Sequence, residues 1–472
     1  MFFLLASCTF DHTPLPDNGY PPDVGRIITT QCSTPGCHTR KSKAAAGGLA
    51  METWADLFAG GNGGAVVIPY RPDQSWLMFY TNTDTARGIV LQPTMPFNRP
   101  PLSLHEWQTL YNWIINGAKN NKGEIAFPPV EGRTKIYIAN QGCDIITVVD
   151  AETRLAMRYI DVGNSPDLEF PHFVKVSPDR KFWYIVHLNS TYIEKFNAHD
   201  DSRIGTIPIG TGYWNTMAIS GDGRYGYVVD LSDDGHVAIL DLQEMKIIAN
   251  IWGLRWPHGS WCTRDGRTLY VTSQYGNYIY KLDVSNLNFI QSERIVLAPG
   301  QSPHNFQGTL DPHEVIMTPD ETKYFVTCQA SDEVRVFDAS TDQLIKVIPV
   351  GNYPQEMAVS QRYPYLLVTC LDDPCAQPKC RGSLYVINYE TLEIVAVVNQ
   401  GFYQPHGVAV VDLEGYAVVA SRNLDLEGPP PHHASNCGGR NGFIQFVDLN
   451  TLTLQPQFKT EVSVDPYAVG VR

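Results

Sequence analysis

The pattern of apolar and polar residues divides the chain into two parts with different periods. From residue 131 onward, short apolar runs recur, each followed by a turn that contains Ser or Thr and then, in most repeats, Asp. Examples of these runs with their turns are 173–179, 216–222 and 314–320, and the strands that follow them are 182–186, 225–229 and 323–327. A third strand ends in Asp and a fourth ends near Gly. Short strands at regular spacing, bounded by turn residues, predict an all-β repeat structure.

The repeats predict a seven-bladed β-propeller over residues 131–472. The position five residues before each turn recurs seven times, at intervals of about 40 to 60 residues, and four strands in about 40–45 residues describe one blade. The first repeat, 135–163, lacks its innermost strand, whereas the C-terminal segment 465–471 has the pattern of one. We therefore expect the C-terminal strand to complete the first blade and close the ring, which hides the edges of the sheets.

Residues 25–122 follow a helical pattern instead. Residues 75–80 are apolar at helical spacing. Ser103 and Glu106 have the spacing of a capping box at the start of a longer helix, and Gly117 follows its end. The expected apolar face of this helix consists of Trp107, Leu110, Tyr111, Ile114 and Ile115. The first part of the chain is therefore predicted to be a small all-α domain that precedes the propeller.

Length and composition agree with two domains and restrict the partners. The chain has 472 residues, of which only 18% are charged, and its formal net charge is −14. This charge disfavours nucleic acid and anionic membrane surfaces as partners, and it is compatible with a basic partner protein. The ten cysteines indicate an oxidising compartment or bound cofactors.

The N-terminus suggests export. Residues 1–8 are apolar and end in Leu-Ala-Ser-Cys, which resembles a bacterial lipobox, in which Cys8 would be lipidated. The segment is short and has no Lys or Arg before the apolar run, so a buried N-terminal strand is the alternative. Residues 9–24 are rich in Pro and Asp and suit a flexible tether. We expect residues 1–24 to be a lipoprotein-type signal and tether that anchors a periplasmic or cell-surface protein, with the lipid as its only membrane contact.

The strongest chemical signal is a pair of cysteines followed directly by a histidine. Cys32 and Cys37 precede His38, which is the order of covalent c-type haem attachment, although four residues separate the cysteines instead of the usual two. Met95 follows in a Pro-flanked loop, and the capped helix comes after it. This order resembles the class I cytochrome c family. The resemblance implies one haem c, bound covalently by Cys32 and Cys37, with His38 and Met95 as the axial iron ligands. The alternative is a short disulfide loop before a histidine.

Three other side chains could compete for the iron. Met51 is one, and Met78 lies at a helical core position, where packing is the more common role. His105 lies on the last helix, where a surface position is more common.

The repeat pattern resembles YVTN-type propellers and, more distantly, the propellers of haem nitrite reductases and nitrous oxide reductase. The recurring position at the start of each innermost strand should face the central channel; it holds His172, Asn215, His258, His313, Gln355, His406 and Tyr467. The four histidines could hold a second haem or copper. The match is partial, because the nitrite reductases have eight blades and nitrous oxide reductase adds a cupredoxin domain. The alternative is that the histidines only line a channel.

Three insertions, 298–311, 372–382 and 423–440, should gather on the face where the innermost strands begin. They carry His304, His432 and His433, and they suggest a docking surface, in particular for the protein's own cytochrome domain.

The remaining cysteines lie in the propeller. Two disulfides are expected among Cys143, Cys375, Cys380 and Cys437, with Cys375–Cys380 as the local pairing. Cys328 and Cys370 could form a third disulfide or remain buried thiols, and Cys262 should be a packing residue.

These patterns favour an exported, lipid-anchored c-type cytochrome that performs one-electron transfer with redox partner proteins and uses the propeller as a docking scaffold. The alternative is a periplasmic oxidoreductase with a second haem or copper on the propeller axis, where His172, His258, His313 and His406 would be the catalytic candidates for reduction of a small nitrogen oxide.

Overall fold

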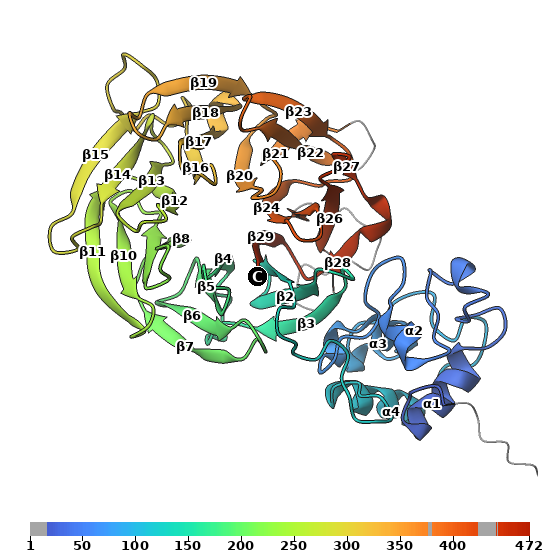
Figure 1. Cartoon of the computed structure of the whole chain (residues 1–472). Coiled ribbons are helices and arrows are strands. Elements are labelled where there is room, and N and C mark those ends of the chain that lie inside the picture. The colour runs from blue at the N-terminus through green and yellow to red at the C-terminus, as the bar shows by residue number, and fades with distance from the viewer. Residues whose placement is uncertain (1–16, 376–379, 423–439, 441) are drawn as a thin grey trace, which may run out of the picture.

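A computed structural model of the chain describes residues 17–375, 380–422, 440 and 442–472. It contains a seven-bladed β-propeller, as expected, and a helical region that lies beside the ring (Figure 1). Six blades are four-stranded antiparallel sheets, and the seventh has a fifth strand, β28, paired with β26. Among the described residues, no helix is long and apolar enough to cross a membrane.

Each blade runs from an innermost strand at the axis to an outermost strand at the rim (Figure 1). Blade 1 consists of β29 (Pro466–Val471), β1 (Lys135–Asn140), β2 (Ile145–Asp150) and β3 (Ala156–Asp161). Blade 2 consists of β4 (Pro171–Val176), β5 (Phe182–His187), β6 (Tyr192–Asn197) and β7 (Arg203–Pro208). Blade 3 consists of β8 (Trp214–Ile219), β9 (Tyr225–Asp230), β10 (Gly235–Asp241) and β11 (Lys246–Leu254). Blade 4 consists of β12 (Pro257–Cys262), β13 (Thr268–Ser273), β14 (Tyr278–Asp283) and β15 (Gln291–Val296).

The remaining blades follow the same order. Blade 5 consists of β16 (Pro312–Met317), β17 (Lys323–Cys328), β18 (Glu333–Asp338) and β19 (Leu344–Pro349). Blade 6 consists of β20 (Pro354–Val359), β21 (Tyr365–Pro374), β22 (Arg381–Asn388) and β23 (Glu393–Val398). Blade 7 consists of β24 (Pro405–Val411), β25 (Tyr416–Ser421), β26 (Gly442–Asp448), β27 (Thr453–Leu454) and β28 (Thr460–Val462).

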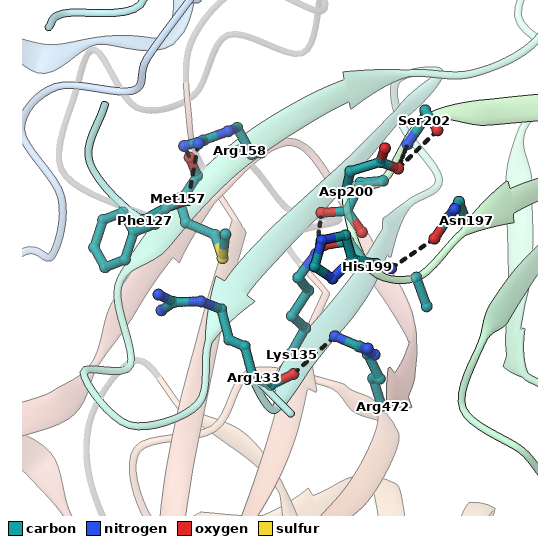
Figure 2. Close-up of polar contacts among 12 residues, drawn as sticks. Phe127, Arg133, Lys135, Met157, Arg158, Asn197, His199, Asp200, Ser202 and Arg472 are labelled. Atoms are coloured by element: carbon teal, nitrogen blue, oxygen red, sulfur yellow. Dashed lines mark hydrogen bonds and ion pairs between the residues drawn. The ribbon is translucent and has the colours of Figure 1, made fainter. Parts of the chain in front are cut away.

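The C-terminal strand closes the ring as predicted. Strand β29 pairs antiparallel with β1, with Gly470 opposite Tyr137 and Ala468 opposite Ala139. At the end of this pairing, the Arg472 side chain donates to the Arg133 carbonyl at 3.3 Å (Figure 2). The first blade therefore depends on residues from both ends of the propeller sequence, which leaves no free sheet edge at the closure.

The turn Ser or Thr that marked the repeats has a structural reason. In blade 2, the Ser177 hydroxyl donates to Asp179 at 2.6 Å and accepts the Phe182 amide at 3.0 Å. Blade 5 repeats this arrangement with Thr318 and Asp320. One hydroxyl thus bonds to both sides of the turn and fixes the register of the first two strands. This explains why the Ser or Thr in the sequence pattern marks where these strands meet.

The propeller core lies between adjacent blades. Between blades 1 and 2, the rings of Tyr137 and Trp183 stack at 4.9 Å, and Trp183 stacks on Phe196 at 3.9 Å. Burial of an aromatic side chain typically contributes about 1.5–3 kcal/mol. Every blade interface repeats this kind of packing, so the ring is stabilised by contacts that exist only when neighbouring blades are both present.

Residues 17–122 form four short α-helices joined by loops and 3₁₀ turns. The helices are α1 (Pro22–Ile27), α2 (Trp54–Phe58), α3 (Trp76–Thr81) and α4 (Leu104–Ile115), and a π-helical turn, Ile28–Cys32, follows α1. Among the described residues, the 3₁₀ turns are Lys43–Ala45, Pro72–Gln74, Thr85–Arg87, Gln329–Ser331 and Pro456–Phe458. Ser103 and Glu106 form the predicted capping box at the start of α4. This region has an apolar core of its own, separate from the blades.

Two sequence expectations for this region need correction. Tyr20 and Val24 are buried in the helical core, so the expected tether of residues 9–24 ends earlier than predicted. On α4, Ile115 is exposed and Trp113 is buried instead. The cause is that the chain turns back after the helix, where the Ala118 amide donates to the Trp113 carbonyl and the Trp113 indole donates to the Lys119 carbonyl.

The helical region packs against the side of blades 1 and 7. Ala65 and Ile68 share a buried apolar cluster with Leu155 of blade 1. Arg71 forms an ion pair with Asp161 at 2.8 Å. The Arg440 guanidinium donates to the Gln74 and Ala65 carbonyls, at 2.7 to 3.0 Å.

The connecting segment is also held. Arg158 donates to the Ala126 and Phe127 carbonyls at 3.0 Å, and Figure 2 shows Arg158 beside Phe127. The segment that joins the two parts is therefore fastened to β3.

Candidate functional site

The Cys32–His38 segment is a closed loop at the end of the π-helical turn. The His38 amide donates to the Cys32 carbonyl at 3.2 Å, and the Cys37 amide donates to the Thr34 carbonyl at 3.0 Å. These bonds bring the two cysteines and the histidine to one side of the helical region. Gly36 has φ +85°, a conformation that a residue with a Cβ rarely adopts, so this tight loop needs glycine there.

His38 is held in one orientation. Its Nδ1 lies 3.3 Å from the Leu49 carbonyl, which can only accept, so Nδ1 carries the proton. The His38 carbonyl in turn accepts the Met51 amide at 2.8 Å. Burial lowers the pKa of His38, and the bond to Leu49 counters only part of this effect. The imidazole is therefore neutral at neutral pH, and its Nε2 lone pair is available to a metal.

Both cysteines of the loop are free thiols, which argues against the disulfide alternative. Cys32 is buried, with 8% of its surface exposed, and Cys37 is half-buried. Burial, followed by the neighbouring Cys37, raises the pKa of the Cys32 thiol to about 12. Cys32 is thus a protonated thiol within the apolar core of the helical region.

The loop that carries Met95 approaches the same end of the helical region. The Met95 amide donates to the Tyr80 carbonyl at 2.7 Å, which fastens the loop to α3. Arg99 donates to the Thr30 carbonyl at 3.2 Å, two residues before Cys32. Met95 is half-buried. The sequence-predicted pair of His38 and Met95 is thus carried by two loops that are bonded to adjoining parts of one small fold.

The competing residues have other roles in the structure. Met51 and Met78 are buried in the apolar core, and His105 is exposed on α4.

Sequence reasoning missed Trp107 as a polar group. Its Nε1 is buried without a hydrogen-bond partner among the described residues, although the rest of the ring packs in the core. A buried donor without a partner costs about 1–3 kcal/mol, so this N–H suits an acceptor on a bound group.

The four histidines and Tyr467, which lie at the starts of five innermost strands, bring their rings together at the propeller axis. The rings of His172 and Tyr467 lie 4.2 Å apart, and those of Tyr467 and His406 lie 3.6 Å apart. His406, His313 and His258 continue the series, at 5.7 and 4.0 Å. The four histidines are only 1–5% exposed. They form a packed layer across the axis rather than the lining of a wet channel.

Threonines of the neighbouring blades position this layer. Thr272 donates to the His313 carbonyl at 3.0 Å, and Thr369 donates to the His406 carbonyl at 2.7 Å. His258 Nδ1 donates to the His313 carbonyl at 3.0 Å, which links blades 4 and 5 directly. The layer is therefore part of the contact between blades.

The histidine layer is neutral. Burial lowers the pKa of His258 to about 4, and burial together with neighbouring histidines places the pKa of His313 well below its usual range. In the described part of the chain, no group of three or more His, Cys, Asp or Glu side chains is arranged to hold a metal ion. His406 makes no hydrogen bond of ordinary geometry through either ring nitrogen, although the Tyr467 backbone is close.

Sequence reasoning also missed three charged residues below this layer. Lys175, Glu314 and Glu356 lie on the innermost strands β4, β16 and β20 and line one cavity. The signal was present, because charged residues in otherwise apolar innermost strands are unusual. Their proximity could not be deduced from sequence, because it depends on closure of the whole ring.

The predicted docking role of the insertions is only partly visible. The loop that contains His304 is described and is bonded to blade 4 through Asn277. His432, His433 and Cys437 lie outside the described residues, as does Cys8. The helical region contacts the sides of blades 1 and 7 and also their loop residues Cys143 and Val464, with Arg440 as the described contact from the third insertion (Figure 1).

The described residues test some of the cysteine predictions and leave others untested. The local disulfide Cys375–Cys380 is confirmed. Cys143 is also disulfide-bonded, whereas Cys437 lies outside the described residues. Cys328 and Cys370 are free and buried, so the third disulfide is wrong and the buried-thiol alternative holds. Burial raises the pKa of both thiols far above the usual range, which makes them unreactive. Cys262 is a buried free thiol that packs between blades 3 and 4.

Comparison with known proteins bears on the fold alone. No protein-family model matches the chain, and no curated protein matches it. A functionally unknown protein from Desulfotomaculum acetoxidans DSM 771 is similar in structure, with a TM-score of 0.54 and 11% identity over 71% of this chain and 98% of that chain. The periplasmic gluconolactonase PpgL of Pseudomonas aeruginosa is similar with a TM-score of 0.54 and 13% identity, over 72% of this chain and 98% of that chain. A putative 6-phosphogluconolactonase from Bacteroides uniformis ATCC 8492 is similar with a TM-score of 0.53 and 15% identity, over 72% of this chain and 100% of that chain. These similarities identify the large part of the chain as a seven-bladed β-propeller.

Proposed function

We propose that this protein is an exported c-type cytochrome that carries out one-electron transfer, with the β-propeller as a docking scaffold for redox partner proteins. Cys32 and Cys37 hold one haem c by thioether bonds, and His38 and Met95 bind its iron. Cys8, which lies outside the described residues, is the proposed lipid anchor at a periplasmic or cell-surface membrane face.

The observation that carries this proposal is the orientation of His38. Metal-binding histidines almost always donate their other ring N–H to a carbonyl or carboxylate, and His38 donates Nδ1–H to Leu49. A disulfide loop offers no reason for an oriented, neutral imidazole directly after a free thiol at Cys37. The unpartnered Trp107 N–H adds a second reason, since it provides a donor for a bound group with acceptor oxygens.

The residues around the proposed haem have separate roles. A c-type haem supplies an iron that changes oxidation state, and a thioether ligand raises its reduction potential. Leu49 holds the proton on His38 Nδ1, so that Nε2 keeps its lone pair. The apolar core around Cys32 excludes water. Exclusion of water keeps the surroundings of a redox group constant and favours outer-sphere electron transfer over side reactions.

Spectroscopy of the purified protein tests the proposal. The full chain, expressed with haem-maturation machinery, should give a c-type pyridine haemochrome and reversible one-electron reduction. Met95→Ala should keep the covalent haem and lower the reduction potential, whereas His38→Ala should disrupt iron ligation. His105→Ala, on the exposed face of α4, is the matched control and should behave as wild type. A chain without haem, or a Met95→Ala variant with unchanged potential, would contradict the assignment.

One observation favours the second candidate, an oxidoreductase with a second haem or copper at the histidine layer. His406 has two ring nitrogens without ordinary hydrogen bonds, next to His313. The same sample tests this candidate, because stoichiometric copper or a second haem type would support it. A single haem and no further metal would leave the histidine layer with its packing role.

A further inference from the structure

Below the histidine layer, the propeller axis contains a cavity of about 240 Å³ that has no part in the proposed electron transfer. It shares Lys175, Ser260 and Trp261 with a second cavity of about 490 Å³. The larger cavity reaches the turns between the first and second strands, at Pro178 and Thr318. The histidine layer covers the opposite end. The two cavities therefore adjoin each other along the axis.

Opposite charges face this cavity without touching. Lys175 comes from β4, whereas Glu314 and Glu356 come from β16 and β20. Among the described residues, Lys175 has no carboxylate within the 4.0 Å of an ion pair. Its Nζ lies 5.6 Å from the centre of the Trp261 ring and 5.9 Å from that of Phe173. An ammonium and two carboxyl groups thus line one small space and leave a gap between them.

Glu314 has an unused oxygen. The side chain is only 7% exposed; its Oε1 accepts the Val315 amide at 3.1 Å, and its Oε2 has no partner among the described residues. A buried carboxyl oxygen without a partner is unfavourable, so a ligand that donates to it would gain more than one bound at the surface.

Burial disfavours ionisation of the two carboxyl groups that face this cavity. Burial raises the pKa of Glu356 to about 7, and burial with the neighbouring Glu356 raises the pKa of Glu314 well above its usual range. Each carboxyl group therefore keeps its proton to a higher pH than an exposed carboxyl does, and an ammonium group placed beside the pair would favour the ionised forms.

We propose that the axial cavity binds a small zwitterion of the α-amino acid type. Its ammonium group donates to Glu314 Oε2 and to Glu356, and its carboxylate accepts from Lys175. The ligand thus fills the gap between the charges and completes a row of ion pairs across the axis. Binding forms and breaks no covalent bond, and a proton that the free carboxyl groups hold passes to solvent when they ionise beside the ammonium group.

The charges select this class over simpler ions. A lone cation would pair with the carboxyl groups but be repelled by Lys175. A lone anion would pair with Lys175 but be repelled by the ionised carboxylate. A zwitterion satisfies both sides, and its side chain could extend into the larger cavity beside Trp261.

Calorimetric titration of the full chain with glycine tests the proposal. Glycine should bind with one-to-one stoichiometry, while ethylammonium and acetate, which each carry half of its charges, should bind at least about tenfold more weakly. Glu314→Gln and Lys175→Met should each weaken glycine binding by about tenfold or more, since each removes one charge-assisted hydrogen bond. Glu390→Gln and Lys181→Met, at exposed positions, are the matched controls and should bind as wild type.

Several results would overturn the proposal. The first is the absence of any heat of binding with glycine, and the second is equal affinity for ethylammonium and glycine. The third is an unchanged affinity for glycine in both the Glu314→Gln and the Lys175→Met variants. The comparison of whole and half ligands uses wild-type protein, so it decides the matter even if a variant fails to fold. Loss of haem would leave this test unaffected, because the cavity lies entirely within the propeller.

Discussion

Replacing Glu356 by Gln should stabilise the protein above neutral pH and leave its stability nearly unchanged in acid. In the folded protein, burial raises the pKa of Glu356 from 4.5 to about 7, and Lys175 offsets only part of this rise. Folding therefore favours the protonated carboxyl. The resulting stability is fully present below the unfolded pKa and is lost as the pH rises through the folded pKa. Gln keeps the shape and cannot ionise, so the variant avoids this loss.

The size of the effect follows from the shift. At about 1.4 kcal/mol per pKa unit, a rise from 4.5 to about 7 corresponds to about 3.5 kcal/mol at pH values well above the folded pKa. Glu314 faces the same cavity, and its charge couples to that of Glu356, so part of this energy is shared by the pair. For a propeller that unfolds as one unit, 1 kcal/mol corresponds to about 1–2 °C in melting temperature. The variant should therefore melt about 4 °C higher than wild type in mild alkali.

Differential scanning calorimetry between about pH 5 and about pH 8 is the assay. The difference in melting temperature between Glu356→Gln and wild type should increase steadily over this range. Glu390→Gln, at an exposed turn, should show no such increase. The reasoning would be refuted if the difference in melting temperature were the same at every pH, or if the variant were less stable than wild type at the alkaline end. Either result would mean that burial on the axis does not raise the pKa of Glu356.

Three further predictions concern the packing that positions the two sites. Ser103→Ala removes the capping hydroxyl of α4 and should lower the stability of the helical region by about 1 kcal/mol, measured by thermal unfolding followed by circular dichroism. Ile68→Ala should cost about 2–5 kcal/mol at the contact with blade 1 and speed proteolytic cleavage in residues 123–130, and unchanged cleavage would refute it. His406→Phe keeps an aromatic ring against Tyr467 and should be far better tolerated than His406→Ala, which opens a cavity worth about 2–4 kcal/mol; equal melting temperatures for both variants would contradict a packed layer.

The fold of the larger part was predictable because its signals are local and repeated. The hydroxyl of Ser177 and its counterparts sets the same turn in blade after blade, and the C-terminal strand completes the only incomplete repeat. The capping box at Ser103 is likewise local, and the structure confirms it. Such signals need no knowledge of which segments meet in space.

What could not be predicted depends on contacts between distant segments. The sequence placed His406 on the axis but could not show that it stacks on Tyr467 and is buried, because that packing follows from ring closure. It missed the burial of Trp113, because the chain folds back over it only after α4 ends. The bond from His38 to Leu49 joins residues whose proximity no periodic pattern encodes. The candidate residues were thus predictable, whereas their electrostatic surroundings were not.

The most direct test of the central claim is the intact mass of the denatured chain. The protein should be produced with haem-maturation machinery, denatured to remove any non-covalent group, and measured by mass spectrometry beside the Cys32→Ala and Cys37→Ala double variant. Wild type should carry the mass of one haem, and the double variant should carry none. A wild-type chain without added mass would contradict the assignment of the Cys32–His38 loop as a haem attachment site.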